Sequence, residues 1–390
     1  MVPMSISRRR FMKAVGTGGV LIAGGLVWRA TDQGVFSPGT GIAYVPWTNW
    51  RGDDVHPTWN LVRAAILAAN AHNAQPWIFH VTDRSLSLFA DQARNLGSMD
   101  PLRREMYISL GCAVENLCLA APANGFEANV QLMPRVQDPS HAAEIDLSGI
   151  KSQHSALYEA IPLRHTDRSA YSRERPIEPD VLGALSALQS SPDTKVTWFS
   201  SPELRARVGK QTVDATQAIM DDTQMSLSSA RWFRSSWAEV QEHRDGITMD
   251  AQGMNWMMTL LAKMAPALTE RQADGYWLQS VRDTQTVSAA AYGVISISNF
   301  PDRSQLIEAG RLWQRLHLAA ITMGLAMQPL NQIVERTDRE AEENLTPSFG
   351  DGLQALVGSG PWRGVFIFRT GYPLEEALPS PRRSLDQVLA

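Results

Sequence analysis

A fifteen-residue pattern occurs twice in the chain, and it constrains the fold more than any other feature. Residues 111–125 read GCAVENLCLAAPANG, and residues 310–324 read GRLWQRLHLAAITMG. Both copies follow Gly-x5-Leu-x-Leu-Ala-Ala-x3-Gly, with six identities at a constant offset of 199, where ordinary composition gives about one by chance. Their apolar residues recur at helical spacing, so each copy predicts a core helix that ends at a glycine. The pattern predicts an internal duplication; the alternative is two unrelated alanine-rich helices.

Length and composition narrow the class of protein. The chain has 390 residues, of which 44% are hydrophobic and 19% charged, so it is long enough for two units or one large duplicated unit with a substantial core. Its net charge is −4, without the basic excess that is typical of nucleic-acid binding. It has 2 cysteines and 8 scattered histidines, which predict no disulfide scaffold and no metal site.

The first residues predict export. Residues 7–13, Ser-Arg-Arg-Arg-Phe-Met-Lys, match the pattern read by the twin-arginine translocase, and the uncharged residues 14–27 follow with five glycines. This run is too short to span a bilayer core of about 30 Å, so we interpret residues 1–33 as a signal segment for a periplasmic or extracytoplasmic protein. No clear cleavage site follows, which leaves an uncleaved, membrane-tethered form as an alternative. The other alternative is a chance basic N-terminus.

The rest of the chain predicts an α+β fold in two halves. Residues 34–54 are rich in Gly, Pro and Thr and are expected to form a linker, with folded structure beginning near His56. The expected halves are 55–150, with a hairpin formed by strands at 77–81 and 86–89, and 151–390, with strands at 292–297 and 364–368. Residues 202–286 read as a helical insertion rich in Trp and Met, which forms either a lid over a pocket or extra core helices.

Two polar clusters are candidates for binding. The first comprises Asn70, His72, Asn73 and Gln75, followed by Pro76 and Trp77. Side-chain amides combine donors and acceptors, as the edge of a polar ring requires. The alternative interpretation is a polar turn with capping amides.

The second cluster spans residues 164–171. Arg164 and Arg168 are four residues apart, so we expect them on one helical face with their guanidinium groups converging on an anion, together with Thr166. A basic tail at residues 382–383 adds two more arginines. The alternative interpretation is a solvated charge run.

Together these segments resemble the nitroreductase superfamily. Residues 70–77 are similar to its Ser-x-x-Asn-x-Gln-Pro-Trp motif with Asn70 in place of Ser, and residues 164–171 to its Arg-Arg-Ser-x-Arg-x-Phe/Tyr motif with His165 in place of the second Arg and Tyr171 one residue late. The repeated helix, the closing Arg-Arg-Ser-Leu and the Arg244-Asp245-Gly246 element resemble its Acg-type branch.

The resemblance implies a cofactor and a set of residues that bind it. It implies a nitroreductase-like fold that binds FMN as a fused pseudo-dimer, one flavin per monomeric chain, with the amide segment supplied by the first half and the arginine segment by the second. The implied cofactor-binding residues are Asn70, His72, Asn73, Gln75, Arg164, His165, Thr166, Arg168, Gln328, Pro329, Leu330, Arg382 and Arg383. No side chain is identified as an acid, base or nucleophile, since the flavin carries the redox chemistry.

Three functions remain open from the sequence. The first is an exported FMN-dependent oxidoreductase of the nitroreductase type that acts on a small molecule. The second is a protein that binds or sequesters flavin with little turnover, and the third is an exported sugar- or peptide-binding module that uses its tryptophans.

Overall fold

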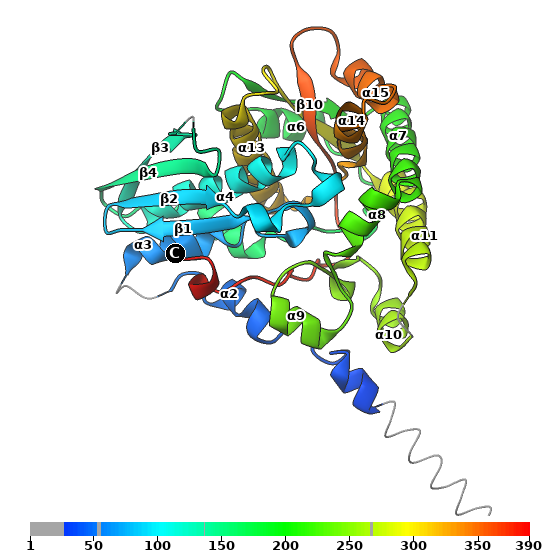
Figure 1. Cartoon of the computed structure of the whole chain (residues 1–390), viewed down its shortest axis with the longest axis horizontal. Coiled ribbons are helices and arrows are strands. Elements are labelled where there is room, and N and C mark those ends of the chain that lie inside the picture. The colour runs from blue at the N-terminus through cyan, green and yellow to red at the C-terminus, as the bar shows by residue number, and fades with distance from the viewer. Residues whose placement is uncertain (1–26, 53–55, 136, 266–267) are drawn as a thin grey trace, which may run out of the picture.

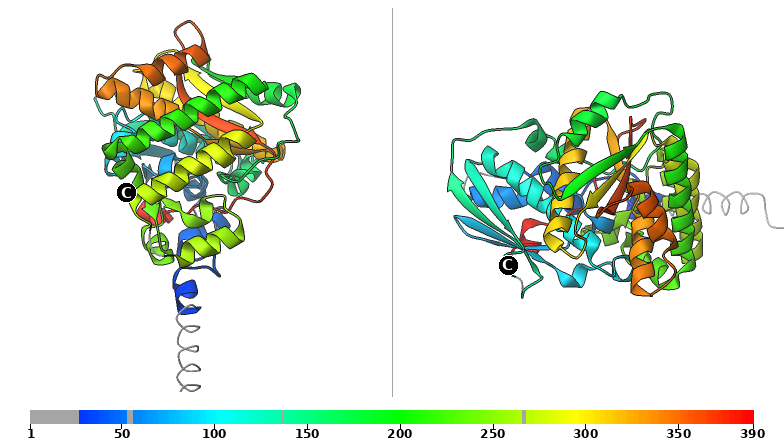
Figure 2. Two further views of the ribbon diagram at one scale, coloured as in Figure 1. Left: turned by 90° about the vertical axis from the view of Figure 1, so that its right-hand side faces the viewer. Right: turned by 90° about the horizontal axis from the view of Figure 1, so that it is seen from above.

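The computed structural model describes residues 27–390 except 53–55, 136 and 266–267. The twin-arginine motif and most of the predicted signal segment therefore lie outside the described residues. Two sheets flank a central pair of long helices, and further helices cover the second sheet (Figures 1 and 2).

The two main sheets have the same topology. The first contains β1 (Trp77–Val81), β2 (Ser85–Ala90), β3 (Phe126–Leu132) and β4 (His141–Gly149) in the order β1-β2-β4-β3. The second contains β5 (Thr194–Phe199), β8 (Ala291–Ile297), β9 (Ala326–Pro329) and β10 (Arg363–Gly371) in the order β5-β8-β10-β9. Every neighbouring pair in both sheets is antiparallel. In each sheet, the strand that is fourth along the chain lies between the second and the third.

The two copies of the repeated pattern form the central helices. These helices are α4 (Arg104–Ala123) and α13 (Arg303–Thr322), and each connects the second and third strands of its sheet. A Cβ atom on Gly111 would lie 2.0 Å from the carbonyl oxygen of Ile307, and one on Gly310 would lie 2.0 Å from that of Ile108. The helices thus cross with backbones in direct contact, which only glycine permits at these positions. Although α4 has the length and hydropathy of a membrane-crossing helix, it is mostly buried inside the protein.

The remaining helices complete the layers. Before the first sheet come a short turn at Ile42–Tyr44, α2 (Val45–Thr48) and α3 (Pro57–Ala65), and between the sheets come α5 (Ala156–Glu159) and α6 (Pro179–Ser186). The second sheet is covered by α14 (Gln332–Glu342) and α15 (Ser348–Val357). The other short 3-10 turns are Ala71–Asn73, Gln92–Arg94, Gly97–Met99, Ile161–Leu163, Met249–Ala251 and Leu385–Gln387. Residues Val281–Gln285 form a π-helical turn between α11 (Glu270–Ser280) and α12 (Thr286–Ser288).

Folded structure begins earlier than the sequence predicted. The segment expected to be a linker contributes Tyr44, Trp47 and Trp50 to the main hydrophobic core. Its Gly and Pro content indicated irregular backbone, but three large aromatic side chains bury enough apolar surface to fix it in place. The expected start near His56 was therefore wrong.

The insertion between β5 and β8 has two parts. It comprises α7 (Pro202–Asp221), α8 (Thr223–Ala230), α9 (Trp237–His243), α10 (Trp256–Met264), α11 (Glu270–Ser280) and α12 (Thr286–Ser288), with the two-stranded parallel pair β6 (Phe233–Arg234) and β7 (Ile247–Thr248). Val208 and Ala215 of α7 belong to the core of the second sheet. The part around Trp232 instead packs with Ala74 and Leu96 of the first half. Extra core helices and a cover over the first half are both present.

The C-terminal tail crosses from the second sheet to the first. The amide of Phe79 in β1 donates to Val388 at 2.8 Å, and the amide of Ala390 donates to Phe79 at 3.0 Å. This strap carries residues 380–384 past the loop at residues 70–75.

The crossing of α4 and α13 generates a stability prediction. Gly111→Ala should lower the free energy of unfolding by about 3 kcal/mol, because its Cβ meets a backbone carbonyl that cannot move aside alone. Gly183→Ala is the matched control: its Cβ meets nothing within 4 Å in α6, so it should stabilise the protein by about 0.5–1 kcal/mol. Urea unfolding measures both, and equal effects would contradict the close crossing.

Candidate functional site

The amide loop at residues 70–75 has a strained backbone. His72, Asn73 and Gln75 have φ angles of 49°, 54° and 53°, in the left-handed region that non-glycine residues seldom adopt. The side chain of Asn70 helps to hold this shape, since its Oδ1 accepts from the amide of Gln75 at 2.8 Å. Such strain persists only where surrounding contacts fix it, and it clusters at binding sites.

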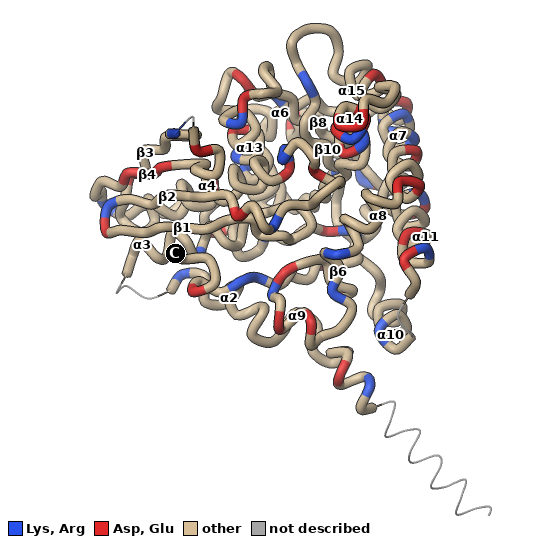
Figure 3. The backbone as a smooth tube through the Cα atoms, in the orientation of Figure 1, with Lys and Arg blue, Asp and Glu red and all other residues tan. Residues whose placement is uncertain are grey.

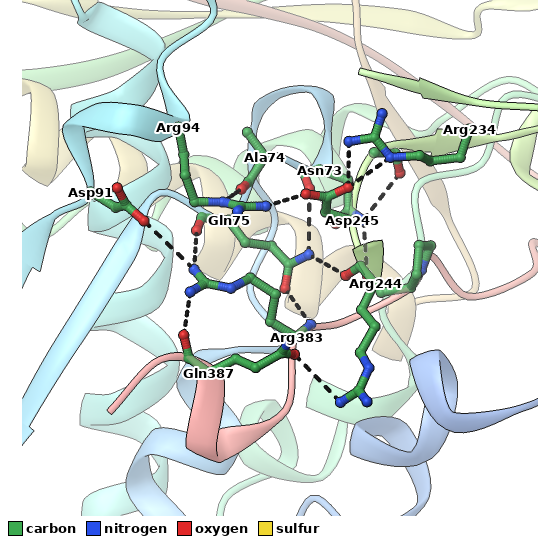
Figure 4. A network of polar contacts seen from close by, with 12 residues as sticks. Asn73, Ala74, Gln75, Asp91, Arg94, Arg234, Arg244, Asp245, Arg383 and Gln387 are labelled. Carbon is green, nitrogen blue, oxygen red and sulfur yellow. Dashed lines mark hydrogen bonds and ion pairs between the residues drawn. The ribbon is translucent and has the colours of Figure 1, made fainter. Parts of the chain in front are cut away.

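The insertion and the C-terminal tail clamp this loop (Figure 4). Asn73 Nδ2 donates to the carbonyls of Gly246 at 3.1 Å and Pro381 at 2.9 Å. Gln75 Nε2 donates to the carbonyl of Arg244 at 2.8 Å, and its Oε1 accepts from the amide of Arg383 at 2.8 Å. Two distant segments therefore meet at this loop, and the Arg244–Gly246 element covers it.

Asp245 fastens this cover to the first half. Its buried carboxylate pairs with Arg234 at 2.6 Å and with Arg94, and Arg94 also donates to the carbonyl of Ala74. Figure 4 shows the arginines converging on Asp245 beside the amide loop. A buried carboxylate that bridges two arginines is expensive to break, so the cover is firmly held.

The arginine segment at residues 164–168 is not helical, so the expected helical face was wrong. The turn at Ile161–Leu163 ends before Arg164, whose backbone is extended. The amide of Asp167 then donates to Met327 of β9 at 3.3 Å. Arg164, Thr166 and Arg168 nevertheless line one cavity, together with His165, so the residues come together without the helical period that the prediction assumed.

A buried cationic cluster forms where this segment meets the tail. Arg164 and Arg382 are both 2% exposed. Among the described residues, Arg164 Nε and Nη1 and Arg382 Nε have no hydrogen-bond partner. Burial lowers the pKa of Arg164 to about 10, and burial together with the Arg164 charge holds the pKa of Arg382 well below its usual value. Buried charges are normally paired, so unused donors on two adjacent guanidinium groups indicate an anion site.

His165 is uncharged beside this cluster. Burial, and then the charges of Arg164 and Arg382, lower its pKa to about 3. Its imidazole is therefore neutral at ordinary pH and adds no charge to the cluster.

Two cavities meet at Thr166 and Arg168. The smaller, of about 30 Å³, is lined by Trp47, Ala69, Asn70, Asn73, Arg164, His165, Thr166, Arg168, Ser380 and Arg382. The larger, of about 470 Å³, lies between the arginine segment and α10, and its lining includes Phe36, Met254, Trp256, Leu260 and Lys263. A polar recess lined by three arginines thus adjoins a mainly apolar chamber of the size that small ligands occupy.

Seven of the thirteen predicted residues line the smaller cavity, and the others lie around it. Gln75 and Arg383 form the clamp, and His72 Nε2 lies 3.2 Å from the hydroxyl of Ser229. Burial, with a smaller contribution from Arg168, lowers the pKa of His72 to about 4.

The predicted residues 328–330 lie behind the arginine segment. The amide of Leu330 already donates to Ile367 of β10 at 2.8 Å. Gln328 Oε1 accepts from Arg369 at 2.6 Å, and Arg369 also donates to the carbonyl of Ser169 at 2.6 Å. Through Arg369 these residues support the arginine segment, without lining either cavity.

The sequence interpretation missed Trp47. Its ring lies edge-on to His165 at 4.6 Å and under the Arg382 guanidinium at 4.8 Å, and its indole donates to Ser380 at 2.7 Å. The available signal was the close spacing of Trp47 and Trp50 inside the Gly- and Pro-rich segment 34–54, which is unusual for a solvated linker.

Comparison with known proteins finds relatives that are named as nitroreductases. No family model matches it. It is 36% identical over 341 residues to the protein named Putative NAD(P)H nitroreductase Rv3131 of Mycobacterium tuberculosis (strain ATCC 25618 / H37Rv), covering 86% of this chain and 92% of that protein. Putative NAD(P)H nitroreductase acg of the same strain is 27% identical over 337 residues, covering 84% and 93%. Among solved structures, a nitroreductase with bound FMN from Desulfitobacterium hafniense DCB-2 gives a TM-score of 0.38 at 13% identity, covering 60% of this chain and 98% of that one.

Proposed function

Because this chain belongs to the nitroreductase family, we propose that it is an exported oxidoreductase that holds one FMN per chain and reduces a small molecule. When bound, FMN supplies the hydride and electron chemistry. The observation that carries the proposal is the buried pair Arg164 and Arg382, whose unused N–H donors need an anion.

The residues present fit the phosphate of FMN. Arg164 and Arg382 supply buried charge and free donors, and Thr166 lines the same recess. Charge-assisted hydrogen bonds to a phosphate are about twice as strong as neutral ones. Asn73 orients Arg382, because its Oδ1 accepts from that guanidinium.

The adjoining chamber suits a flat, largely apolar group. Phe36, Met254, Trp256 and Leu260 supply apolar surface to its lining, and Arg168 lies on the side that adjoins the phosphate recess. We assign no proton donor or base among its side chains.

The duplication and the pseudo-dimer belong to the same proposal. Equal strand order in the two sheets, helices α4 and α13 offset by 199 residues, and reciprocal glycine contacts support two related halves at 55–150 and 151–390. The amide loop comes from the first half and Arg164 and Arg382 from the second. One complete site per chain follows from that division.

Flavin sequestration is the second candidate, and the clamp favours it. Asn73 and Gln75 are bonded to the Arg244–Gly246 cover, and the recess beside the arginines is small. A closed site retains its ligand and limits access of a second one. Turnover with NADPH and a nitroaromatic separates the candidates: brisk turnover favours the oxidoreductase, and a tightly bound flavin without turnover favours sequestration.

The phosphate assignment makes a specific prediction. Arg164→Ala should weaken FMN binding by about 1.5–3 kcal/mol, the scale of hydrogen bonds to a charged group. It should leave riboflavin, which lacks the phosphate, nearly unaffected. Fluorescence titration of both flavins measures this, with Arg207→Ala on the exposed surface of α7 as the matched control. Equal losses of affinity for FMN and riboflavin would contradict the assignment of the phosphate to this cluster.

The division of the site between halves predicts the stoichiometry. We expect one FMN per chain, bound by a monomer, because each half supplies only one of the two segments. Flavin extraction combined with light scattering measures both quantities. Two flavins per chain, or binding only by an oligomer, would contradict the fused arrangement.

Export makes a prediction of its own. Changing Arg8 and Arg9 to Lys should block translocation, because the delocalised guanidinium fork is not replaced by an ammonium point charge. Cell fractionation should then find the protein in the cytoplasm, still able to bind FMN. Undiminished extracytoplasmic protein in this variant would refute the proposed route.

A further inference from the structure

Helix α10 presents an unusually apolar face to solvent. Trp256, Met257, Met258 and Leu261 are 74%, 54%, 51% and 58% exposed. The only charged residue of the helix, Lys263, turns inward, where it pairs with Asp250 at 2.7 Å and donates to the carbonyl of Gly34 at 3.2 Å. Clusters of large exposed apolar side chains mark interaction surfaces, whereas single ones are ordinary.

This face is continuous with the start of the described chain. Arg29 donates to the carbonyl of Met264 at 3.1 Å and to that of Ala265 at 2.7 Å, which joins helical residues 27–32 to the end of α10. Val27 and Trp28 are 61% and 69% exposed there. We call Val27, Trp28, Trp256, Met257, Met258 and Leu261 the α10 face. In Figure 1 and in the left view of Figure 2, α10 and the start of the described chain lie at the end of the molecule opposite α14 and α15.

We propose that the α10 face docks on a lipid bilayer. The occupant is inferred from the sequence that leads into the face. Residues 14–27 are uncharged and mostly apolar, and this run ends at Val27, which lies in the face beside Trp28. If that segment resides in a membrane, α10 lies at the membrane surface. Tryptophan favours the interface between water and lipid, and Met and Leu suit shallow insertion among acyl chains.

The chemistry of the face favours lipid over other occupants. With Lys263 turned inward, the α10 face contains no charged residue (Figure 3). Its hydrogen-bonding side-chain groups are the indole N–H groups of Trp28 and Trp256, which gives it little with which to recognise a specific polar partner. Trp256 and Leu260 also line the chamber described above. Met257, Met258 and Leu261 do not line it, so they serve as probes that leave the proposed flavin site untouched.

A site-specific probe tests the proposal in the full chain. Met257→Cys is labelled with an environment-sensitive fluorophore, and Leu345→Cys is the matched control, since Leu345 is 50% exposed in the connection between α14 and α15. The native cysteines interfere little: Cys112 is buried, and burial raises the pKa of Cys118 to about 12. Unsubstituted protein gives the labelling background.

Vesicles of phosphatidylethanolamine and phosphatidylglycerol should shift the emission at position 257 to the blue. Brominated acyl chains should quench it several-fold more than at position 345. The proposal is overturned if neither position responds or if both respond equally. It is also overturned if position 257 shifts without vesicles in proportion to protein concentration, which would identify a second copy as the occupant.

A second variant guards against an effect of the label. Adding Met258→Ser and Leu261→Ser to the labelled Met257→Cys chain removes apolar contact area, so the apparent partition of the probe into lipid should fall roughly tenfold. Both side chains are exposed, and urea unfolding checks that stability is unchanged. An unaltered probe response in this folded variant would also overturn the proposal. FMN content, measured in parallel, reports the proposed function independently of docking.

Discussion

The backbone contact between Gly111 and Gly310 is the constraint on which the rest of the structure depends. Because neither residue has a side chain, α4 and α13 approach until each presses against a carbonyl of the other. This contact sets the separation of the two sheets and buries both helices on nearly all sides. Gln314 Nε2 donates a hydrogen bond to Asn116 Oδ1 across the same interface at 2.7 Å. These two buried amide side chains therefore have hydrogen-bond partners within the packed interface.

The site is a direct consequence of that crossing. Gln314 of α13 accepts from the amide of Ala69 at 3.0 Å, which fixes the chain just after α3. The carbonyls of Leu67 and Ala68, at the same place, accept from Arg164 at 3.1 Å and from Arg382 at 3.3 Å. Free carbonyls after a helix attract cations, but these two bonds use only part of each guanidinium. Both side chains line the recess, and Arg164 Nε and Nη1 and Arg382 Nε have no partner among the described residues. The contacts that fix this part of the fold therefore leave positive charge without a counterion.

The parts of this arrangement that the sequence predicted are those with a local signal. Strand β1 has the predicted bounds, Trp77–Val81, because alternation and a following turn mark it. Strands β3, β4, β5 and β9 were not predicted. For β9, which has only 4 residues, and β5, which buries only its two ends, the local signal is weak and the form depends on pairing with distant strands. Strand β3 does alternate along its length, and this signal was missed. The amide loop was placed correctly at a junction, but the partners of Gln75 come from residues 244 and 383, which no local pattern connects to it. The path of the chain after Arg164 likewise depends on Met327, whose carbonyl accepts from the amide of Asp167 although it lies far away in the sequence.

Because the site is built from segments that are far apart in the sequence, binding and folding should be linked in this protein. Arg164 and Arg382 are buried with unused donors, and burial together with the charge of Arg164 lowers the pKa of Arg382. An unpaired buried cation is costly. An anion that binds only the folded chain therefore stabilises it in proportion to its free concentration and affinity. Under the proposed function, FMN is that anion, and the Arg244–Gly246 cover closes over the loop beside it. A chain that folds around its cofactor before export would cross the membrane with this charge already neutralised, which is the order of events that a translocase for folded proteins permits.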